Sequence, residues 1–169
     1  MNRLATSFAE LLDPQFEYVF TQGPDKATNL HEAAEHGMNC VSVAHWLLDK
    51  LTGHRLPTDM YCFEMFYSSV FEAVRAVREM RIGDLVWLGN PANGRMQDSI
   101  PDFADGQMAN WGGCPVNHIG VFTGRFAWHN DPLILHASSV EGTNVVQPLS
   151  AMARVPNWSH VYGIKRLAV

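Results

Sequence analysis

The spacing of apolar residues changes at about residue 83 of this chain, and this change limits the folds that the sequence can form. Before it, apolar residues recur every three or four positions in residues 3–12, in residues 40–51 and from Pro57 to about Met80, as in amphipathic helices. After it, short β-branched and aromatic runs predict strands: LVWL at 85–88, HIGVF at 118–122, LILHA at 133–137 and HVYGIKRL at 160–167. Helices followed by strands predict an α+β domain with a mostly antiparallel sheet.

Local signals predict where several of these helices begin and end. Pro14 ends the first helix, and a short helix is expected from about Thr28. Asn39 suits the N-cap of the next helix, because its side-chain oxygen can accept a backbone N–H of the first turn, and Gly53 ends that helix. The stretch that reaches Met80 is expected to be one helix with an apolar stripe made of Phe63, Phe66, Tyr67, Val70, Val74 and Val77.

The length of 169 residues predicts a single domain over residues 1–169. We expect its helical part over about residues 1–80 and its sheet part over about residues 83–169. Within the sheet part, residues 89–117 are rich in Gly, Pro, Asn and Asp, and this segment exceeds the ~15 residues that compact domains usually leave without regular structure. It is interpreted either as a lid-like loop over a functional site or as a surface excursion without a role.

Charge and composition argue against several classes of function. The net charge is -5 and no cluster of Lys or Arg stands out, so we expect neither a nucleic-acid partner nor a membrane anchor. Glu10 and Asp13 interrupt the start of the chain before a signal-peptide core can form, and no apolar run approaches the ~20 residues that span a bilayer. Three cysteines do not make a disulfide framework; reduced thiols in a cytoplasmic protein are expected, with a Cys62–Cys114 bridge as the alternative.

Cys40 is the first candidate for chemistry because it falls at the predicted start of the helix that Asn39 caps. Unpaired backbone N–H groups and the positive end of the helix dipole favour an anion there. A thiol in that position has a lowered pKa, and its thiolate is a nucleophile. The same N–H groups could hold the oxyanion of a tetrahedral intermediate. The alternative is that Cys40 is a small core residue.

A thiol nucleophile needs a base, and His118 opens the predicted strand HIGVF just after a loop. His136 lies in the next predicted strand. If the two strands are neighbours, His136 can hydrogen-bond the far nitrogen of His118 and fix its tautomer, as the third member of a catalytic triad does. Either histidine taken alone is better interpreted as a core or surface residue with a structural role.

Five motifs in order resemble the NlpC/P60 family of papain-like cysteine peptidases. They are Asn39-Cys40-Val41-Ser42, Leu56-Pro57, Gly83-Asp84-Leu85-Val86, His118-Ile119-Gly120-Val121-Phe122 and Leu135-His136-Ala137-Ser138-Ser139. The closing segment HVYGIKRL resembles the last core strand of that family. The resemblance runs from about residue 39 to the end of the chain and implies a papain-like NlpC/P60 fold, with N-terminal helices packed on the sheet.

The resemblance also implies roles for individual residues. Cys40 becomes the nucleophile, His118 the general base and later the general acid, and His136 the residue that orients His118. Tyr18 is the only tyrosine upstream of Cys40, where relatives often place one that lines the site. Tyr18, Asn39 and Ser42 are therefore expected to contact the substrate.

The expected activity is that of a cysteine hydrolase that cleaves an amide bond in a small peptide or peptide-like substrate through a thioester. An acyltransferase with the same acyl-enzyme is the first alternative, and a binding domain with a dormant thiol is the second. Asn39 replaces the acidic residue usual in relatives that cut cell-wall peptides, and Val41-Ser42 replaces Ser-Gly. These departures, with the missing export signal, argue against murein hydrolysis but leave the thiol chemistry unaffected.

No metal or cofactor is expected. His31 and His36 resemble a zinc signature, but they are five positions apart and would not share a helical face. Cys114 and His118 have a tolerable spacing for two ligands, but no second pair completes a zinc site.

Overall fold

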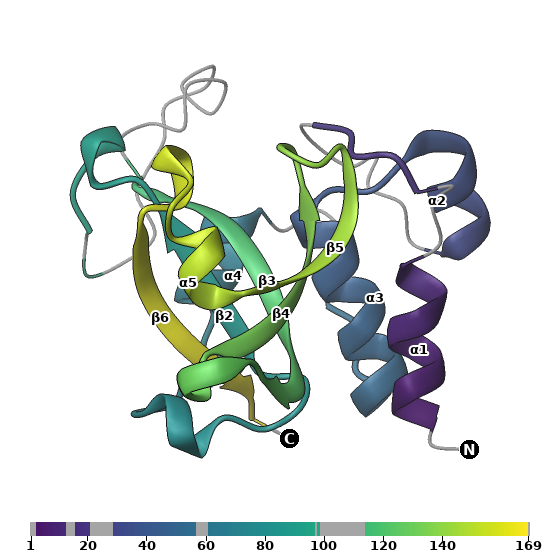
Figure 1. The fold of residues 1–169 in the computed structure, drawn as a ribbon, viewed down its shortest axis with the longest axis horizontal. Coiled ribbons are helices and arrows are strands. Elements are labelled where there is room, and N and C mark those ends of the chain that lie inside the picture. Colours follow the sequence, from purple (N-terminus) through teal and green to yellow (C-terminus); the bar gives the residue numbers. More distant parts are fainter. Residues whose placement is uncertain are drawn as a thin grey trace.

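The computed structural model describes residues 3–12, 16–20, 29–56, 61–96, 98 and 114–168. Its helices are α1 (Arg3–Leu11), α2 (Leu30–His36), α3 (Cys40–Thr52), α4 (Cys62–Tyr67) and α5 (Leu149–Met152). Short 3-10 turns cover Val77–Glu79, Pro91–Asn93, Trp128–Asn130 and Pro156–Trp158. Helices α1, α2 and α3 lie together on one side of a strongly bent sheet (Figure 1).

The sheet has six strands in the described chain: β1 (Phe71–Ala73), β2 (Leu85–Gly89), β3 (Val116–Phe126), β4 (Pro132–Ser138), β5 (Thr143–Pro148) and β6 (His160–Leu167). Their order is β1-β6-β2-β3-β4-β5, and every pairing is antiparallel. The prediction of an α+β fold with N-terminal helices on a mostly antiparallel sheet is therefore confirmed. Strand β5 was not expected, because its two valines stand between the polar residues Asn144 and Gln147 and the segment ends in Pro148, so no run of strand-forming residues marks it.

The main hydrophobic core lies between the helices and one face of the sheet. Val43, Ala44 and Leu47 of α3 are fully buried there against Ile119 and Val121 of β3. A second, smaller cluster covers the opposite face, where Met152 of α5 and Trp158 pack with residues of the central strands. Both faces of the central strands are thus covered, which explains why LVWL is buried along its whole length instead of alternating.

Helix α3 begins and ends where its capping residues predict. The Asn39 side chain accepts a hydrogen bond from the backbone N–H of Ser42 at 2.9 Å. At the other end Gly53 takes a left-handed conformation with φ of 70°, and its N–H donates to the carbonyl of Asp49. Helices α1 and α2 also lie where they were expected, α2 starting two residues after Thr28.

The predicted helix up to Met80 is wrong beyond Tyr67, and the helical part of the chain ends there instead of near residue 80. Ser68 turns the backbone to an extended conformation, and Phe71–Ala73 then pairs with Leu167–Lys165 of β6. Backbone hydrogen bonds to β6 satisfy this segment, so tertiary pairing overrides the helical spacing of its apolar side chains. Residues 77–79 form only one 3-10 turn.

The predicted lid-like loop over 89–117 is described only at its two ends. Gly89 ends β2 and Val116 starts β3, and these ends meet, because the N–H of Asn90 donates to the carbonyl of Pro115 at 3.0 Å. A side chain on Gly89 would lie 1.8 Å from that same carbonyl oxygen, so only glycine fits. Residues 97 and 99–113 lie outside the described residues, and the lid stays a prediction.

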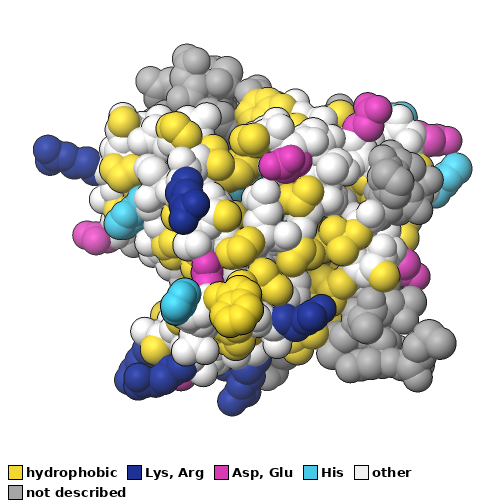
Figure 2. All heavy atoms as spheres, in the orientation of Figure 1, with side chains coloured by type: hydrophobic (Ala, Val, Ile, Leu, Met, Phe, Trp, Pro, Cys, Tyr) yellow, Lys and Arg dark blue, Asp and Glu magenta, His cyan; other side chains and the backbone are white. Residues whose placement is uncertain are grey.

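The basic side chains on one face of the molecule do not form a continuous patch. Figure 2 shows Lys and Arg side chains spaced apart on the face in view, with hydrophobic and uncharged groups between them. No helix among the described residues is both long enough and apolar enough to cross a bilayer.

One partly buried ion pair ties two strands of the sheet together. Asp84, which is 1% exposed, accepts two hydrogen bonds from the Arg166 guanidinium at 2.8 Å and one from the N–H of Arg81 at 2.7 Å. The pair joins the start of β2 to the end of β6. The Gly83-Asp84 motif is therefore structural.

Asp84→Ala is expected to lower the free energy of unfolding by about 3–5 kcal/mol, because it leaves the Arg166 charge without its partner in a partly buried place. Asp49→Ala is the matched control, since it removes an exposed ion pair with Arg55 and should cost less than about 1 kcal/mol. Urea denaturation measures both. Equal effects of the two substitutions would contradict the structural role of Asp84.

Candidate active site

Cys40 is the first residue of α3, as the sequence predicts, and its side chain is 9% exposed. The Asn39 oxygen caps the helix and also accepts a hydrogen bond from the Ser42 hydroxyl at 3.0 Å. The carbonyl of Asn39 accepts the N–H of Val43. The N–H groups of Cys40 and Val41 precede this first intrahelical hydrogen bond, so they point out of the helix end beside the thiol.

A short extended segment holds Tyr18 next to the start of α3. The N–H of Val19 donates to the carbonyl of Met38 at 3.0 Å, and the N–H of Met38 donates to the carbonyl of Glu17 at 2.8 Å. Gly37 makes this approach possible, because it has a φ of 78° and any side chain there would lie 2.7 Å from the Glu17 carbonyl oxygen.

The Tyr18 hydroxyl remains protonated. Burial, and to a smaller extent the negative charge of the nearby Cys40 thiolate, together raise the pKa of Tyr18 to about 12. Tyr18 thus lies close enough to Cys40 for the two groups to interact electrostatically, and its protonated hydroxyl can donate a hydrogen bond.

The two histidines meet across β3 and β4. His118 Nε2 and His136 Nδ1 are 2.9 Å apart, and both side chains are buried. Gly120 of β3 leaves room for β4 at this point, since a side chain there would lie 2.3 Å from Ile134 and 3.3 Å from His136 Cβ. The predicted adjacency of the two strands is confirmed.

A chain of hydrogen bonds assigns the proton positions on these rings. The Gln147 amide nitrogen donates to the Glu141 carboxylate at 3.3 Å, which leaves its oxygen to accept from His136 Nε2 at 3.2 Å. A neutral His136 that carries its proton on Nε2 has an accepting Nδ1. His118 Nε2 must then donate to it, so His118 Nδ1 is the nitrogen that faces the thiol and can take a proton.

Burial holds His136 in this neutral form. Burial and, to a smaller extent, the charge of His118 lower the pKa of His136 to about 3, although hydrogen bonds with Gln147 and the Ala137 backbone act in the opposite direction. His136 therefore orients His118 as a neutral hydrogen-bond acceptor at neutral pH.

Trp158 covers both histidines. Its ring stacks on His118 with centroids 4.0 Å apart and a 12° interplanar angle, and it meets His136 edge-on at 5.4 Å. Trp158 is only 4% exposed, so it shields the histidine pair from water.

The pKa of the Cys40 thiol lies well below its ordinary value. The largest cause is a hydrogen bond from the Cys62 side chain; His118 adds a hydrogen bond and its charge, and the Ile119 backbone contributes another hydrogen bond. Burial acts in the opposite direction. Cys114 differs, because burial raises its pKa. The three cysteines are all reduced.

The structure thus brings together Cys40, His118, His136 and Tyr18. Asn39 and Ser42 lie beside them, but both are buried and bonded to one another in the helix cap, so their contact with substrate stays a prediction. Sequence reasoning missed Cys62, Trp158 and Gln147 as neighbours of the site. No local pattern marks Trp158, whereas the alternation of β5 would have placed Gln147 beside β4 once that strand was recognised.

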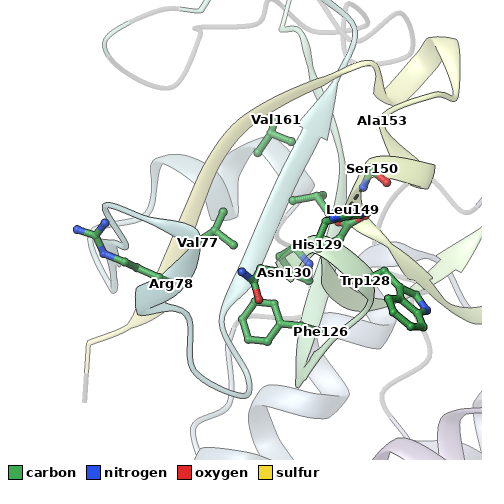
Figure 3. Close-up of a pocket in the computed structure, with 12 residues that line it drawn as sticks. Val77, Arg78, Phe126, Trp128, His129, Asn130, Leu149, Ser150, Ala153 and Val161 are labelled. Atoms are coloured by element: carbon green, nitrogen blue, oxygen red, sulfur yellow. Dashed lines mark hydrogen bonds between the residues drawn. The ribbon is translucent and has the colours of Figure 1, made fainter.

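The described residues hold no group of three potential metal ligands. A separate hollow is lined by Arg78, Phe126, Trp128, Leu149 and Val161, among others (Figure 3). It is formed by the β3–β4 connection and the start of α5, and none of the predicted site residues lines it. The reactive side chains are therefore not part of this hollow.

Solved structures similar to this chain are NlpC/P60 domains. NlpC1 from Trichomonas vaginalis aligns with 97% of the chain at 14% identity and a TM-score of 0.57, and the chain spans 42% of that protein. The P60 domain of an antigen from M. avium subspecies paratuberculosis aligns with 99% of the chain at 16% identity and a TM-score of 0.51, and 96% of that domain is covered. No family model and no curated protein sequence matches the chain. This protein has the NlpC/P60 fold, which confirms the resemblance of its motifs at the level of structure.

At pH 6.5 we expect iodoacetamide to alkylate Cys40 at least about tenfold faster than Cys62 or Cys114, since an ordinary thiol titrates near pH 8.5. His118→Ala should slow this reaction, because the thiolate loses a hydrogen bond and a positive charge. Peptide-resolved mass spectrometry measures the three rates, and His31→Ala, on the exposed surface of α2, is the control. Equal, slow labelling of all three cysteines would contradict an activated thiol.

Acid should destabilise the protein through His136. The pKa of His136 is 6.5 in the unfolded state but only about 3 in the folded state. The free energy that neutral His136 contributes to stability is therefore complete above pH 6.5 and is lost progressively as the pH falls below 6.5. His136 alone should account for about 2–3 kcal/mol between pH 7 and pH 4.5. Urea denaturation at both pH values should show that His136→Gln loses less free energy of unfolding on acidification than the wild type does. An equal loss in the two proteins would refute a buried neutral histidine.

Proposed function

We propose that this protein is a cysteine hydrolase that cleaves an amide bond in a small peptide or peptide-like substrate through a thioester acyl-enzyme. The observation that carries the proposal is the contact series from Cys40 to His118 and on to His136. A thiol with a lowered pKa, an imidazole beside it and a neutral group that orients the imidazole are the parts that nucleophilic acyl transfer needs. Solved neighbours with the same fold support it.

The first half-reaction follows from the proton positions. The Cys40 thiolate attacks the carbonyl carbon of the amide while His118 carries the proton on Nδ1. The N–H groups of Cys40 and Val41 and the Tyr18 hydroxyl are the donors nearest to the developing oxyanion. His118 then gives its Nδ1 proton to the leaving nitrogen, the C–N bond breaks, and a thioester and a free amine result.

Hydrolysis of the thioester reverses these roles. His118, now neutral at Nδ1, removes a proton from water while the water oxygen attacks the thioester carbon. The C–S bond then breaks, the Cys40 thiolate leaves, and the carboxylic acid product loses its remaining proton to solvent. An amine or alcohol in place of water would give a transferase with the same acyl-enzyme. The acceptor that reaches His118 decides between the two reactions.

Acyl transfer to Cys40 is tested with p-nitrophenyl acetate and a set of dipeptide p-nitroanilides. We expect release of the chromophore together with an acetyl adduct on Cys40 in the intact-mass and peptide spectra. Cys40→Ala should abolish the adduct, and His118→Ala should slow acylation about 100-fold because the proton transfer is lost. Glycine amide or glycerol as an added acceptor separates hydrolysis from transfer.

The controls isolate the proposed roles. His31→Ala changes an exposed histidine and should acylate at the wild-type rate. If conjugates with the acceptor form faster than free acid, the enzyme is an acyltransferase instead of a hydrolase. If no acyl donor modifies Cys40, the domain is a binding module and the enzymatic proposal is refuted.

A further inference from the structure

The hollow beside the β3–β4 connection and α5 has no part in the reaction proposed above. Its volume is about 980 Å³, at the upper end of the range for pockets that hold small molecules. It is open to solvent, since among its lining side chains Trp128 is 90% exposed, Phe126 42% and Val77 37%. Large apolar side chains that are exposed together at one place are typical of a binding site, whereas single ones scattered over a surface are ordinary.

The turn that carries Trp128 has an unfavourable backbone conformation. His129 and Asn130 both have a positive φ, of 62° and 58°, which residues other than glycine rarely adopt. Hairpin turns that need two such residues usually contain Asn-Gly or Asp-Gly. Backbone hydrogen bonds hold this turn closed, because the N–H of Ala127 donates to the carbonyl of Asp131 at 2.8 Å. The turn brings Trp128 and Asp131 to the wall of the same hollow, and strained backbone of this kind is often found at ligand sites.

Two aromatic rings contribute to the wall of the hollow. The Phe126 ring is held from the interior, because it packs on the ring of buried Phe122 with centroids 5.0 Å apart and an angle of 57° between the planes. The Trp128 ring stands at the edge of the hollow (Figure 3), and most of its surface is open to a ligand. The face of an aromatic ring attracts a cation, and the indole of tryptophan attracts it most strongly.

Asp131 adds a negative charge beside these rings. It is partly buried, and its Oδ1 accepts a hydrogen bond from the N–H of Ser150 at 3.2 Å, which fixes the carboxylate at the start of α5. Its other oxygen has no hydrogen bond or ion pair with any residue that the structure describes. Arg78 also belongs to the wall, but its guanidinium is directed away from the hollow (Figure 3). The aromatic faces and the carboxylate therefore favour a positively charged ligand, as does the net charge of -5.

We infer that this hollow binds a small organic ammonium ion, whose apolar groups lie on Trp128 and Phe126 and whose positive charge faces Asp131. Aromatic side chains are the usual protein groups that recognise quaternary ammonium ions. The volume of the hollow accommodates an ammonium group together with an apolar body. Cys40, His118 and His136 do not line the hollow, so this binding does not depend on the thiol chemistry.

The experiment compares three probes that share a benzene ring and differ in charge: benzyltrimethylammonium, benzyl alcohol and benzenesulfonate. Each is titrated into ¹⁵N-labelled protein at pH 7.5 and constant ionic strength, and the indole and backbone N–H resonances are followed by NMR. Trp128→Phe identifies the Trp128 indole among the five tryptophans. We expect benzyltrimethylammonium to shift this resonance with a dissociation constant on the order of 1 mM, and to bind at least about tenfold more tightly than the other two probes.

Two substitutions separate the contribution of the ring from that of the charge, with the backbone resonances of residues 127–131 as the readout. Trp128→Ala should weaken binding of benzyltrimethylammonium about tenfold or more. Asp131→Asn keeps the acceptor for the Ser150 N–H but removes the negative charge, and should weaken binding about fivefold. Asp49→Asn is the matched control, because it makes the same change in net charge at a carboxylate of α3 outside the hollow, and should bind as the wild type does.

Several results would overturn the ammonium site. Equal affinities for the three probes would show an apolar hollow that does not select charge, and tighter binding of benzenesulfonate would show a site for anions. Shifts confined to other parts of the protein, with the Trp128 indole unchanged, would place the cation elsewhere. Equal effects of Asp131→Asn and Asp49→Asn would remove the role of Asp131. Thermal melts identify any variant that loses its fold, and the comparison of the three probes on the wild type tests the proposal without the variants.

Discussion

The contact between the Cys40 thiol and the His118 imidazole is the interaction on which the arrangement of this molecule depends. Cys40 begins helix α3 and His118 lies in β3, in the middle of the sheet, so the rest of the fold must bring the two side chains together. Packing of α3 on β3 and β4 sets the distance between them. The Asn39 cap and the pairing of residues 17–19 with Met38 fix the helix end, and the hydrogen bond to His136 fixes the ring.

The polar groups of the site are arranged in a line that runs from the protein surface to the thiol. Glu141 orients the Gln147 amide, Gln147 fixes the proton of His136, and His136 directs the proton of His118. Each member has a hydrogen-bond partner, which is why so many polar side chains can be buried together. Trp158 covers the two histidine rings on one side, so both rings lie in a place with little water.

Sequence reasoning succeeded where the signal is local. The cap at Asn39, the end at Gly53 and the strands that carry both histidines follow from spacing and from the chemistry of single residues. It failed where a distant partner decides the structure. Phe71–Ala73 lies in a stretch with helical spacing but forms a strand, because it pairs with the edge of β6. TNVVQP forms a strand because it pairs with the edge of β4. Cys62 and Trp158 reach the site only through tertiary packing, so no reading of neighbouring positions could have placed them there.

The order of these parts along the chain has a consequence for synthesis. Cys40 leaves the ribosome well before His118 and His136, and the strands that carry them can pair only after β4 has been made. Until then the start of α3 has neither the His118 imidazole nor the Trp158 indole beside it, and the Cys40 thiol of the nascent chain has the low reactivity of an ordinary thiol. Reactivity toward cellular electrophiles therefore arises late, as a property of the finished molecule and not of its N-terminal half.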